Sequence, residues 1–237
     1  MKSLNTILSR IKLFISLHPH LSAAITLSVL IIIFISPALF QHRYLAPVDI
    51  YNYVAPYLDI TTQMLPWYKL SDIILGQGHL PLWNIYSGFG LPLFANMQSS
   101  VLFPLTWLFY LLNIKLALLF YAYLKLLLAG FFTYLYLREI NLKYPVSVIG
   151  GIMFAFCGVN AIWFLWPLTS VILILPLSFW LLEKYFNTRN QKFAWILAPV
   201  TALGLFAGHP QTFFYIFFKY QFFYSSISIL EQLLHKS

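Results

Sequence analysis

Long uncharged apolar runs alternate with short polar stretches along this chain. A bilayer core needs about 20 apolar residues for each helix that crosses it, and backbone groups in lipid must form their hydrogen bonds within the segment. The runs therefore predict an all-α polytopic membrane protein with about six transmembrane helices, in a single membrane domain over residues 1–237. The predicted crossings are residues 21–40, 116–137, 146–164, 167–182, 193–208 and 212–230.

One long polar stretch, residues 41–100, interrupts this pattern and is predicted to be a large external loop. Within it, Trp67, Leu70 and Ile74 recur at helical spacing, which predicts a short amphipathic helix lying on the membrane surface. Residues 101–112 are apolar but too few to cross a bilayer, so they are predicted to form a re-entrant or interfacial arm.

The composition supports lipid as the main solvent, because 61% of the residues are hydrophobic, only 8% are charged and the mean hydropathy is +0.80. A soluble domain has roughly a quarter of its residues charged. The net charge of +8 comes from basic residues scattered between the apolar runs, and this scatter argues against nucleic-acid binding.

The positions of the basic residues predict the orientation, since cytoplasmic segments of membrane proteins are enriched in Lys and Arg. With a cytoplasmic N-terminus, the outer side holds Arg43, Lys69 and all three aspartates. The cytoplasmic side then holds nine of the 14 basic residues, namely Lys2, Arg10, Lys12, Arg138, Lys143, Lys184, Arg189, Lys192 and Lys236. We therefore expect a multi-pass protein with both termini in the cytoplasm.

A carboxylate just outside the bilayer can act as a general base toward an acceptor hydroxyl, or bind a divalent metal ion beside a phosphate. Asp59 is the candidate for either role. The alternative is structural, since an aspartate before a short helix can cap its free N–H groups. Asp72 falls within the predicted amphipathic helix, where a solvated polar face explains it, and Asp49 can pair with Arg43.

Aromatic and amide side chains further along the loop could form the wall of a sugar site. Tryptophan stacks on sugar faces, and Asn and Gln hydrogen-bond to hydroxyl groups. An ordered loop that is anchored at the interface by its aromatic residue is an equal alternative. The candidate residues are Trp83, Asn84, Asn96 and Gln98.

Two further polar features lie between or within the predicted crossings. His209 and Gln211 lie where the fifth and sixth helices meet, on the same side as Asp59, so an imidazole and a carboxylate could converge there. A polar turn closed by a proline is the alternative. Lys125 and Lys219 lie inside crossings, where a charge is costly unless it snorkels or is paired. A lipid phosphate or a partner chain is the candidate partner, for Lys125 before Lys219.

Five short motifs follow one another along the chain. Three lie in the loop: D-x-x-x-Q-x-x-P-W from Asp59, G-x-x-P-L-W-N from Gly78 and G-x-P-L-F-A-N-x-Q from Gly90. G-G-I-M-F-A-F-C-G from Gly150 and A-G-H-P-Q from Ala207 lie downstream. Taken together, this order resembles the bacterial YfhO family of membrane proteins over most of the chain.

The resemblance implies a GT-C-like fold in the bacterial plasma membrane. It implies transfer of a hexose from an undecaprenyl-phosphate carrier, a polyprenyl-phosphate sugar donor, to a cell-envelope polymer such as teichoic acid. The essential aspartate of such enzymes is best matched by Asp59, as base or as ligand of a divalent metal ion. The implied site neighbours are Gln63, Asn84, Asn96, His209 and Gln211.

Members of the family are typically much longer than this chain. We therefore expect a fragment, a split gene product or a degenerate copy, with a partner chain supplying the missing helices. The rival to a glycosyltransferase is a non-catalytic membrane subunit or remnant that only packs against a partner. A transporter is a third hypothesis, although the sequence has no pseudo-symmetric pair of broken helices.

Overall fold

The structure is a computed structural model that describes residues 2–40, 45 and 59–218, and it is helical apart from one small hairpin. The bundle consists of α2 (Pro19–Phe40), α6 (Ile114–Glu139), α7 (Tyr144–Ala155), α9 (Pro167–Ile172), α10 (Ile174–Thr188), α11 (Gln191–Phe206) and a helix over residues 210–218. The other elements are α1 (Lys2–Leu17), the π-helical turn η1 (Ile60–Met64), α4 (Leu65–Gly76), β1 (Trp83–Asn84), β2 (Leu91–Pro92), η2 (Met97–Ser99), η3 (Pro104–Trp107), α5 (Leu108–Leu111) and α8 (Gly158–Ile162).

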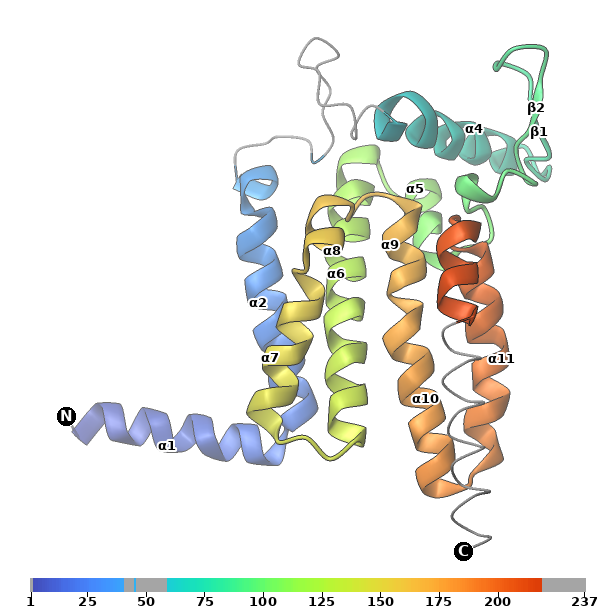
Figure 1. Ribbon diagram of the computed structural model, residues 1–237. Coiled ribbons are helices and arrows are strands. Elements are labelled where there is room, and N and C mark those ends of the chain that lie inside the picture. The colour runs from blue at the N-terminus through green and yellow to red at the C-terminus, as the bar shows by residue number, and fades with distance from the viewer. Residues whose placement is uncertain (1, 41–44, 46–58, 219–237) are drawn as a thin grey trace, which may run out of the picture.

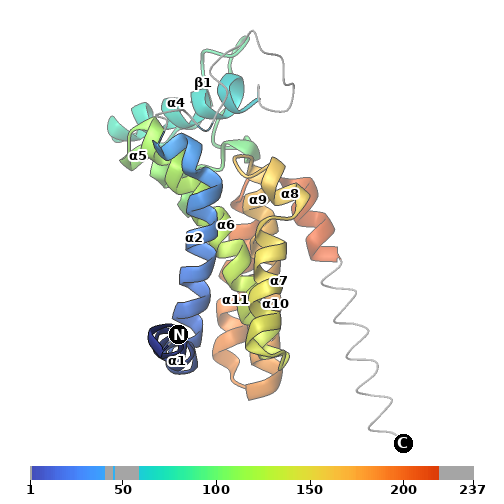
Figure 2. The ribbon, with the colours of Figure 1, turned by 90° about the vertical axis from the view of Figure 1, so that its left-hand side faces the viewer.

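The bundle helices run side by side around α6, which contacts α2, α7 and α10, while α11 packs on α10 (Figures 1 and 2). Helix α1 projects sideways from one end of the bundle, and α4 lies across the other end (Figure 1). We call the α4 end the loop end. We call the opposite end the basic end, because its helix ends and connections carry Arg138, Lys143, Arg189 and Lys192.

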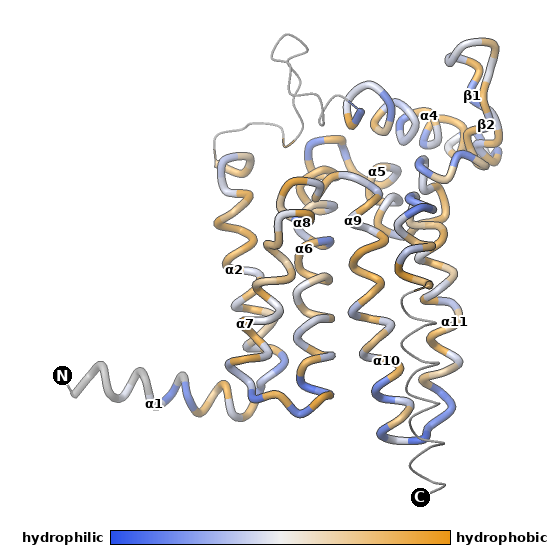
Figure 3. Tube along the Cα trace, in the orientation of Figure 1, coloured by the Kyte–Doolittle hydropathy of each residue, from blue (hydrophilic) through white to orange (hydrophobic). Residues whose placement is uncertain are grey.

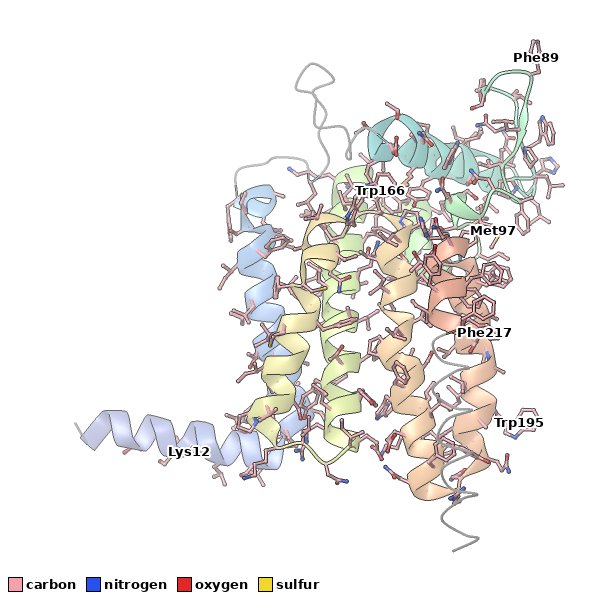
Figure 4. The ribbon with its side chains drawn as sticks, viewed as in Figure 1. Lys12, Phe89, Met97, Trp166, Trp195 and Phe217 are labelled. Carbon is pink, nitrogen blue, oxygen red and sulfur yellow. The ribbon has the colours of Figure 1, made fainter. Side chains whose placement is uncertain are left out.

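Three helices in the described part of the chain are long and apolar enough to cross a membrane: α2, α6 and the unit formed by α9 and α10. Helices α7 and α11 are apolar but shorter, and the apolar residues concentrate between the two polar ends (Figure 3). Trp195 is 76% exposed, and it points away from the bundle, as a side chain that faces lipid would (Figure 4). The chain is therefore a helical membrane protein, and the number of six crossings stays a prediction.

Some predicted crossings correspond to pairs of helices. The stretch predicted at residues 146–164 consists of α7 and α8, which are separated at Phe156 and Cys157. The chain then turns at residues 163–166, and α9 and α10 lead back toward the basic end (Figure 1). The sixth predicted crossing, residues 212–230, begins within a helix over residues 210–218, and its residues 219–230 lie outside the described part of the chain.

A close approach of two glycines joins α6 to α7. A Cβ atom on Gly151 of α7 would lie 2.6 Å from the carbonyl oxygen of Gly130 on α6. A Cβ atom on Gly130 would lie 2.9 Å from Cδ2 of Leu27 on α2. In lipid the hydrophobic effect does not bring helices together, so small residues that permit close packing take over that role. This contact therefore holds three helices in register.

The segment from η1 to α4 is seated on the loop end by one stripe of buried side chains. Ile60, Met64 and Tyr68 are at most 3% exposed, and they share a cluster with Tyr121 of α6 and Phe109 of α5. Residues four apart lie on one helix face, so the three side chains point the same way. The ring centroids of Tyr68 and Phe109 are 4.6 Å apart.

The face of α4 that packs on the protein is not the apolar stripe that was predicted to lie on the membrane surface. Trp67, Leu70 and Ile74 are half-buried, whereas Tyr68 and Ser71 are fully buried. Hydrophobic periodicity does not mark the packed face, because tyrosine and serine count as polar in such a pattern. The covering helices decide otherwise, since α5 and α6 offer an aromatic surface that matches a tyrosine.

Several residues named in the sequence analysis lie outside the described residues. They are Arg43 and Asp49 in the first part of the loop, and Lys219 and Lys236 near the C-terminus.

The glycine contact can be tested by comparing two glycines of the same motif. The substitution Gly151→Val should destabilise the protein by about 1–3 kcal/mol, because the added atoms overlap the backbone of α6. The substitution Gly158→Ala should have little effect, because nothing lies within 4 Å of a Cβ atom there. Thermal unfolding in detergent, followed by tryptophan fluorescence, measures both. Equal unfolding midpoints for the two variants would contradict this account of the packing.

Candidate functional site

Asp59 lies at the start of the π-helical turn η1 and is half-buried at the loop end. Its side chain makes no capping hydrogen bond, so the capping explanation of this residue does not hold. Instead, Gln63 Nε2 donates a hydrogen bond of 3.0 Å to Asp59 Oδ1. Turns of π-helix are rare and frequently lie at functional sites. The first and fifth residues of the D-x-x-x-Q motif thus form one polar pair.

The buried stripe beneath this pair leads to Lys125. Tyr121, which packs with Met64 and Tyr68, presents its ring to the ammonium of Lys125, 4.3 Å from the ring centroid. Lys125 is 1% exposed, and its Nζ donates a hydrogen bond to the carbonyl oxygen of Trp166. A carbonyl dipole and an aromatic face both stabilise a cation. Lys125 therefore links α6 to the turn at Trp166, which is labelled in Figure 4.

Asn84 is engaged in the hairpin. It is 5% exposed, its Nδ2 donates to Ser87 Oγ at 2.9 Å, and its Oδ1 accepts from the backbone N–H of Tyr86 at 2.9 Å. Trp83 is half exposed, and its indole covers Gly90, where φ is +98° and a Cβ atom would collide with the ring. These contacts fix the shape of the hairpin.

Asn96 and Gln98 lie in the segment that leads from the hairpin to the bundle. Asn96 Oδ1 accepts a hydrogen bond of 3.2 Å from the backbone N–H of Gln98 and thereby caps η2. Asn84, Asn96 and Trp67 of α4 line one cavity of about 380 Å³, whose other walls come from residues 91–93 and 95. The side chain of Gln98 is not part of its lining.

The A-G-H-P-Q motif forms a junction between α11 and the loop. Gly208 has φ +100°, and a Cβ atom there would lie 2.9 Å from Pro167 Cβ and 3.0 Å from the carbonyl oxygen of Met97. Ser100 Oγ donates to the carbonyl oxygen of Ala207 at 3.2 Å. Two motifs that are far apart in the sequence therefore meet at the loop end.

The polar residues of that motif are engaged locally. His209 Nδ1 accepts from the backbone N–H of Thr212 at 3.3 Å and lies 2.8 Å from Thr212 Oγ1, so it caps the helix over residues 210–218. Gln211 Nε2 donates to Tyr215 Oη at 2.9 Å. These bonds favour the polar turn over convergence, and no contact in the described part of the chain joins His209 or Gln211 to Asp59.

The pKa values of two tyrosines at the loop end disfavour them as bases. Burial raises the pKa of Tyr110 to about 12, and it raises the pKa of Tyr68 well above its usual value, so both phenols stay protonated near neutral pH. Partial burial lowers the pKa of His209 below its usual 6.5, because the charged imidazolium loses solvation.

A divalent metal ion at Asp59 finds no set of protein ligands in the described ranges. No three His, Cys, Asp or Glu side chains gather there, and Asp72 is paired with Lys69 at 2.7 Å. The residues that the structure describes therefore do not by themselves form a site for such an ion.

Trp67 is the residue of this region that sequence reasoning missed, because it was assigned to the apolar face of α4. A signal was present, since Asp59, Gln63 and Trp67 are spaced four residues apart and helical geometry places them along one stripe. The hydrogen-bond partner of Lys125 could not be predicted from the sequence, because it is the backbone carbonyl of Trp166 and every residue has such a carbonyl.

The apolar helices of the bundle define a helical membrane protein. Its candidate site lies at the loop end, where residues of the large loop cover the bundle. The family model described as bacterial membrane protein YfhO matches residues 23–228 of the chain. The chain therefore belongs to the YfhO family of bacterial membrane proteins. No curated protein and no solved structure matches it.

The depressed pKa of His209 predicts a pH dependence of stability. The unfolded chain binds a proton at this residue more readily than the folded chain, so the contribution is present above about pH 6.5 and is lost as the pH falls through the folded-state pKa. Protonation also removes the Nδ1 acceptor that caps the last helix.

The variant His209→Asn keeps a capping acceptor and removes the titration. Its unfolding temperature should fall less than that of the parent between about pH 7.5 and about pH 5.5. The exposed His79 gives the control, since His79→Asn should retain the parental pH profile. A profile that is unchanged in His209→Asn would count against the assignment.

Proposed function

We propose that this protein is a GT-C-like glycosyltransferase, or the N-terminal part of one, that transfers a hexose from a polyprenyl-phosphate carrier to a cell-envelope polymer such as teichoic acid. The observation that supports it best is the state of Asp59, a half-buried carboxylate that is held by Gln63 across a π-helical turn and not used as a helix cap. Membership of the YfhO family supports the class of reaction.

In the proposed reaction, Asp59 takes the proton of an acceptor hydroxyl as that oxygen attacks the anomeric carbon of the donor sugar. The new bond joins the acceptor oxygen to this carbon, and the bond between the carbon and the carrier phosphate oxygen breaks. The electron pair leaves with the polyprenyl phosphate. Gln63 acts as a positioning residue, because its amide holds Oδ1 and sets the direction of the carboxylate.

The bundle suits a substrate that is anchored in lipid. Helix α4 and η1 lie across the loop end, so a carboxylate there would meet a phosphate headgroup whose chain lies beside the helices (Figure 1). We infer that the loop end faces the outside and the basic end the cytoplasm, because Lys and Arg concentrate at the basic end.

Substitution of Asp59 tests the catalytic role. Asp59→Asn preserves the size of the side chain and removes its charge, so hexose transfer should fall by about 100-fold or more. Asp72→Asn is the matched control, since Asp72 lies on the same segment but pairs with Lys69 at its surface. The measurement is transfer of radiolabelled hexose from undecaprenyl phosphate to envelope polymer in membranes that contain the full chain. Undiminished transfer by Asp59→Asn would contradict the catalytic role of Asp59.

Cysteine labelling tests the orientation. In a Cys157→Ser background, His79→Cys at the loop end should react with a membrane-impermeant maleimide added to intact cells. Gln191→Cys at the basic end should react only after the membrane is permeabilised. Both positions are exposed on the protein, so access to the reagent depends on the side of the membrane. The reverse pattern would place the candidate site in the cytoplasm.

A further inference from the structure

The cavity between α4 and the hairpin has the size and the chemistry of a small-ligand site. Its volume of about 380 Å³ falls within the range of roughly 300–1,000 Å³ that is typical of ligand pockets. Its walls are mostly apolar, and two asparagines and the indole of Trp67 supply the polar and aromatic groups. Apolar walls with a few fixed polar groups are what a specific small-molecule site requires.

The two asparagines differ in what they can offer a ligand. Asn84 has both amide atoms bonded within the hairpin, so it shapes the wall. Asn96 uses Oδ1 to cap η2, and its Nδ2 has no partner in the part of the chain that the structure describes. The amide of Asn96 is therefore a donor whose position is fixed by its own acceptor and which remains free to bind a hydroxyl group.

The lining excludes charged ligands. The sequence contains no Asp, Glu, Lys or Arg between Asp72 and Lys115, and every lining residue other than Trp67 falls in that interval. Burying an unpaired charge against such walls would be costly. A hexopyranose fits them, because its C–H faces pack on an indole while its hydroxyl groups accept hydrogen bonds from an amide.

The cavity lies at the end of the same helical stripe that carries Asp59. Trp67 is eight residues after Asp59 and one helical step of four after Gln63, so the stripe runs from the carboxylate to the cavity. Asp59 itself does not line the cavity. A sugar held in the cavity is therefore a neighbouring unit of the same polymer, distinct from the one that reacts at Asp59.

We propose that the cavity lined by Trp67, Asn84 and Asn96 is a subsite for a neutral hexopyranosyl unit. That the unit belongs to the acceptor polymer rests on the function proposed above. The hairpin that bears Asn84 also carries exposed aromatic side chains. Among them Tyr86 is 79% exposed, and Phe89 stands at the tip, as Figure 4 shows.

The subsite is tested by direct binding of a neutral probe, a tritiated methyl hexoside, to the full chain in lipid nanodiscs. The substitution Asn96→Asp keeps the acceptor that caps η2 and replaces the amide donor, so the affinity should fall by about three- to tenfold. Asn190→Asp is the matched control, because Asn190 also caps a helix, accepts from the Lys192 N–H and lies at the basic end. It should bind the probe like the parent.

Asp59→Asn separates this proposal from the proposed function. It should lose transfer while it retains probe binding, since its charge lies outside the cavity. Binding of the probe by a parent protein that shows no transferase activity would support the subsite and contradict the transferase. Failure of the parent to bind methyl hexosides at millimolar concentration, or equal binding by Asn96→Asp and the parent, would overturn the subsite.

Discussion

The seating of η1 and α4 on the loop end of α6 is the contact on which the proposed site depends. Ile60, Met64 and Tyr68 bury one stripe against α5 and α6, and this stripe fixes the rotation of the segment about its own axis. Once that rotation is fixed, the neighbouring stripe of Asp59, Gln63 and Trp67 must lie along the edge of the contact. The burial of the apolar stripe thus sets the direction in which Asp59 and Gln63 point.

The bundle beneath supplies a rigid base for this contact. Lipid offers helices no hydrophobic reason to associate, so the backbones of α6 and α7 meet at Gly130 and Gly151 and gain dispersion contacts there. Lys125 adds a polar tie between α6 and the corner at Trp166. Leu165 and Trp166 of that corner pack in the same cluster as Met64, so the base and the site share one set of contacts.

One part of the candidate site is formed by residues close together in the sequence, and the other part is formed by residues that only the fold brings together. The pair of Asp59 and Gln63 follows from the spacing of four residues, and a local motif was enough to name both. The cavity joins residues of α4 to residues of the hairpin and the following segment, and the turn at His209 is tied to Ser100 through Ala207. Such contacts arise from packing, which short motifs record only indirectly.

The sequence by itself determined the class of protein, the family and the places where apolar helices occur, because the bilayer imposes long uncharged runs that no other solvent requires. It also named the loop and the carboxylate within it. Only the tertiary structure decided which face of α4 is buried, since tyrosine and serine bury well against a matching aromatic surface and poorly elsewhere. The structure likewise decided that Lys125 bonds to a carbonyl, that Asp59 is not a cap and that His209 is one, because backbone groups and neighbouring turns become partners only when the chain has folded.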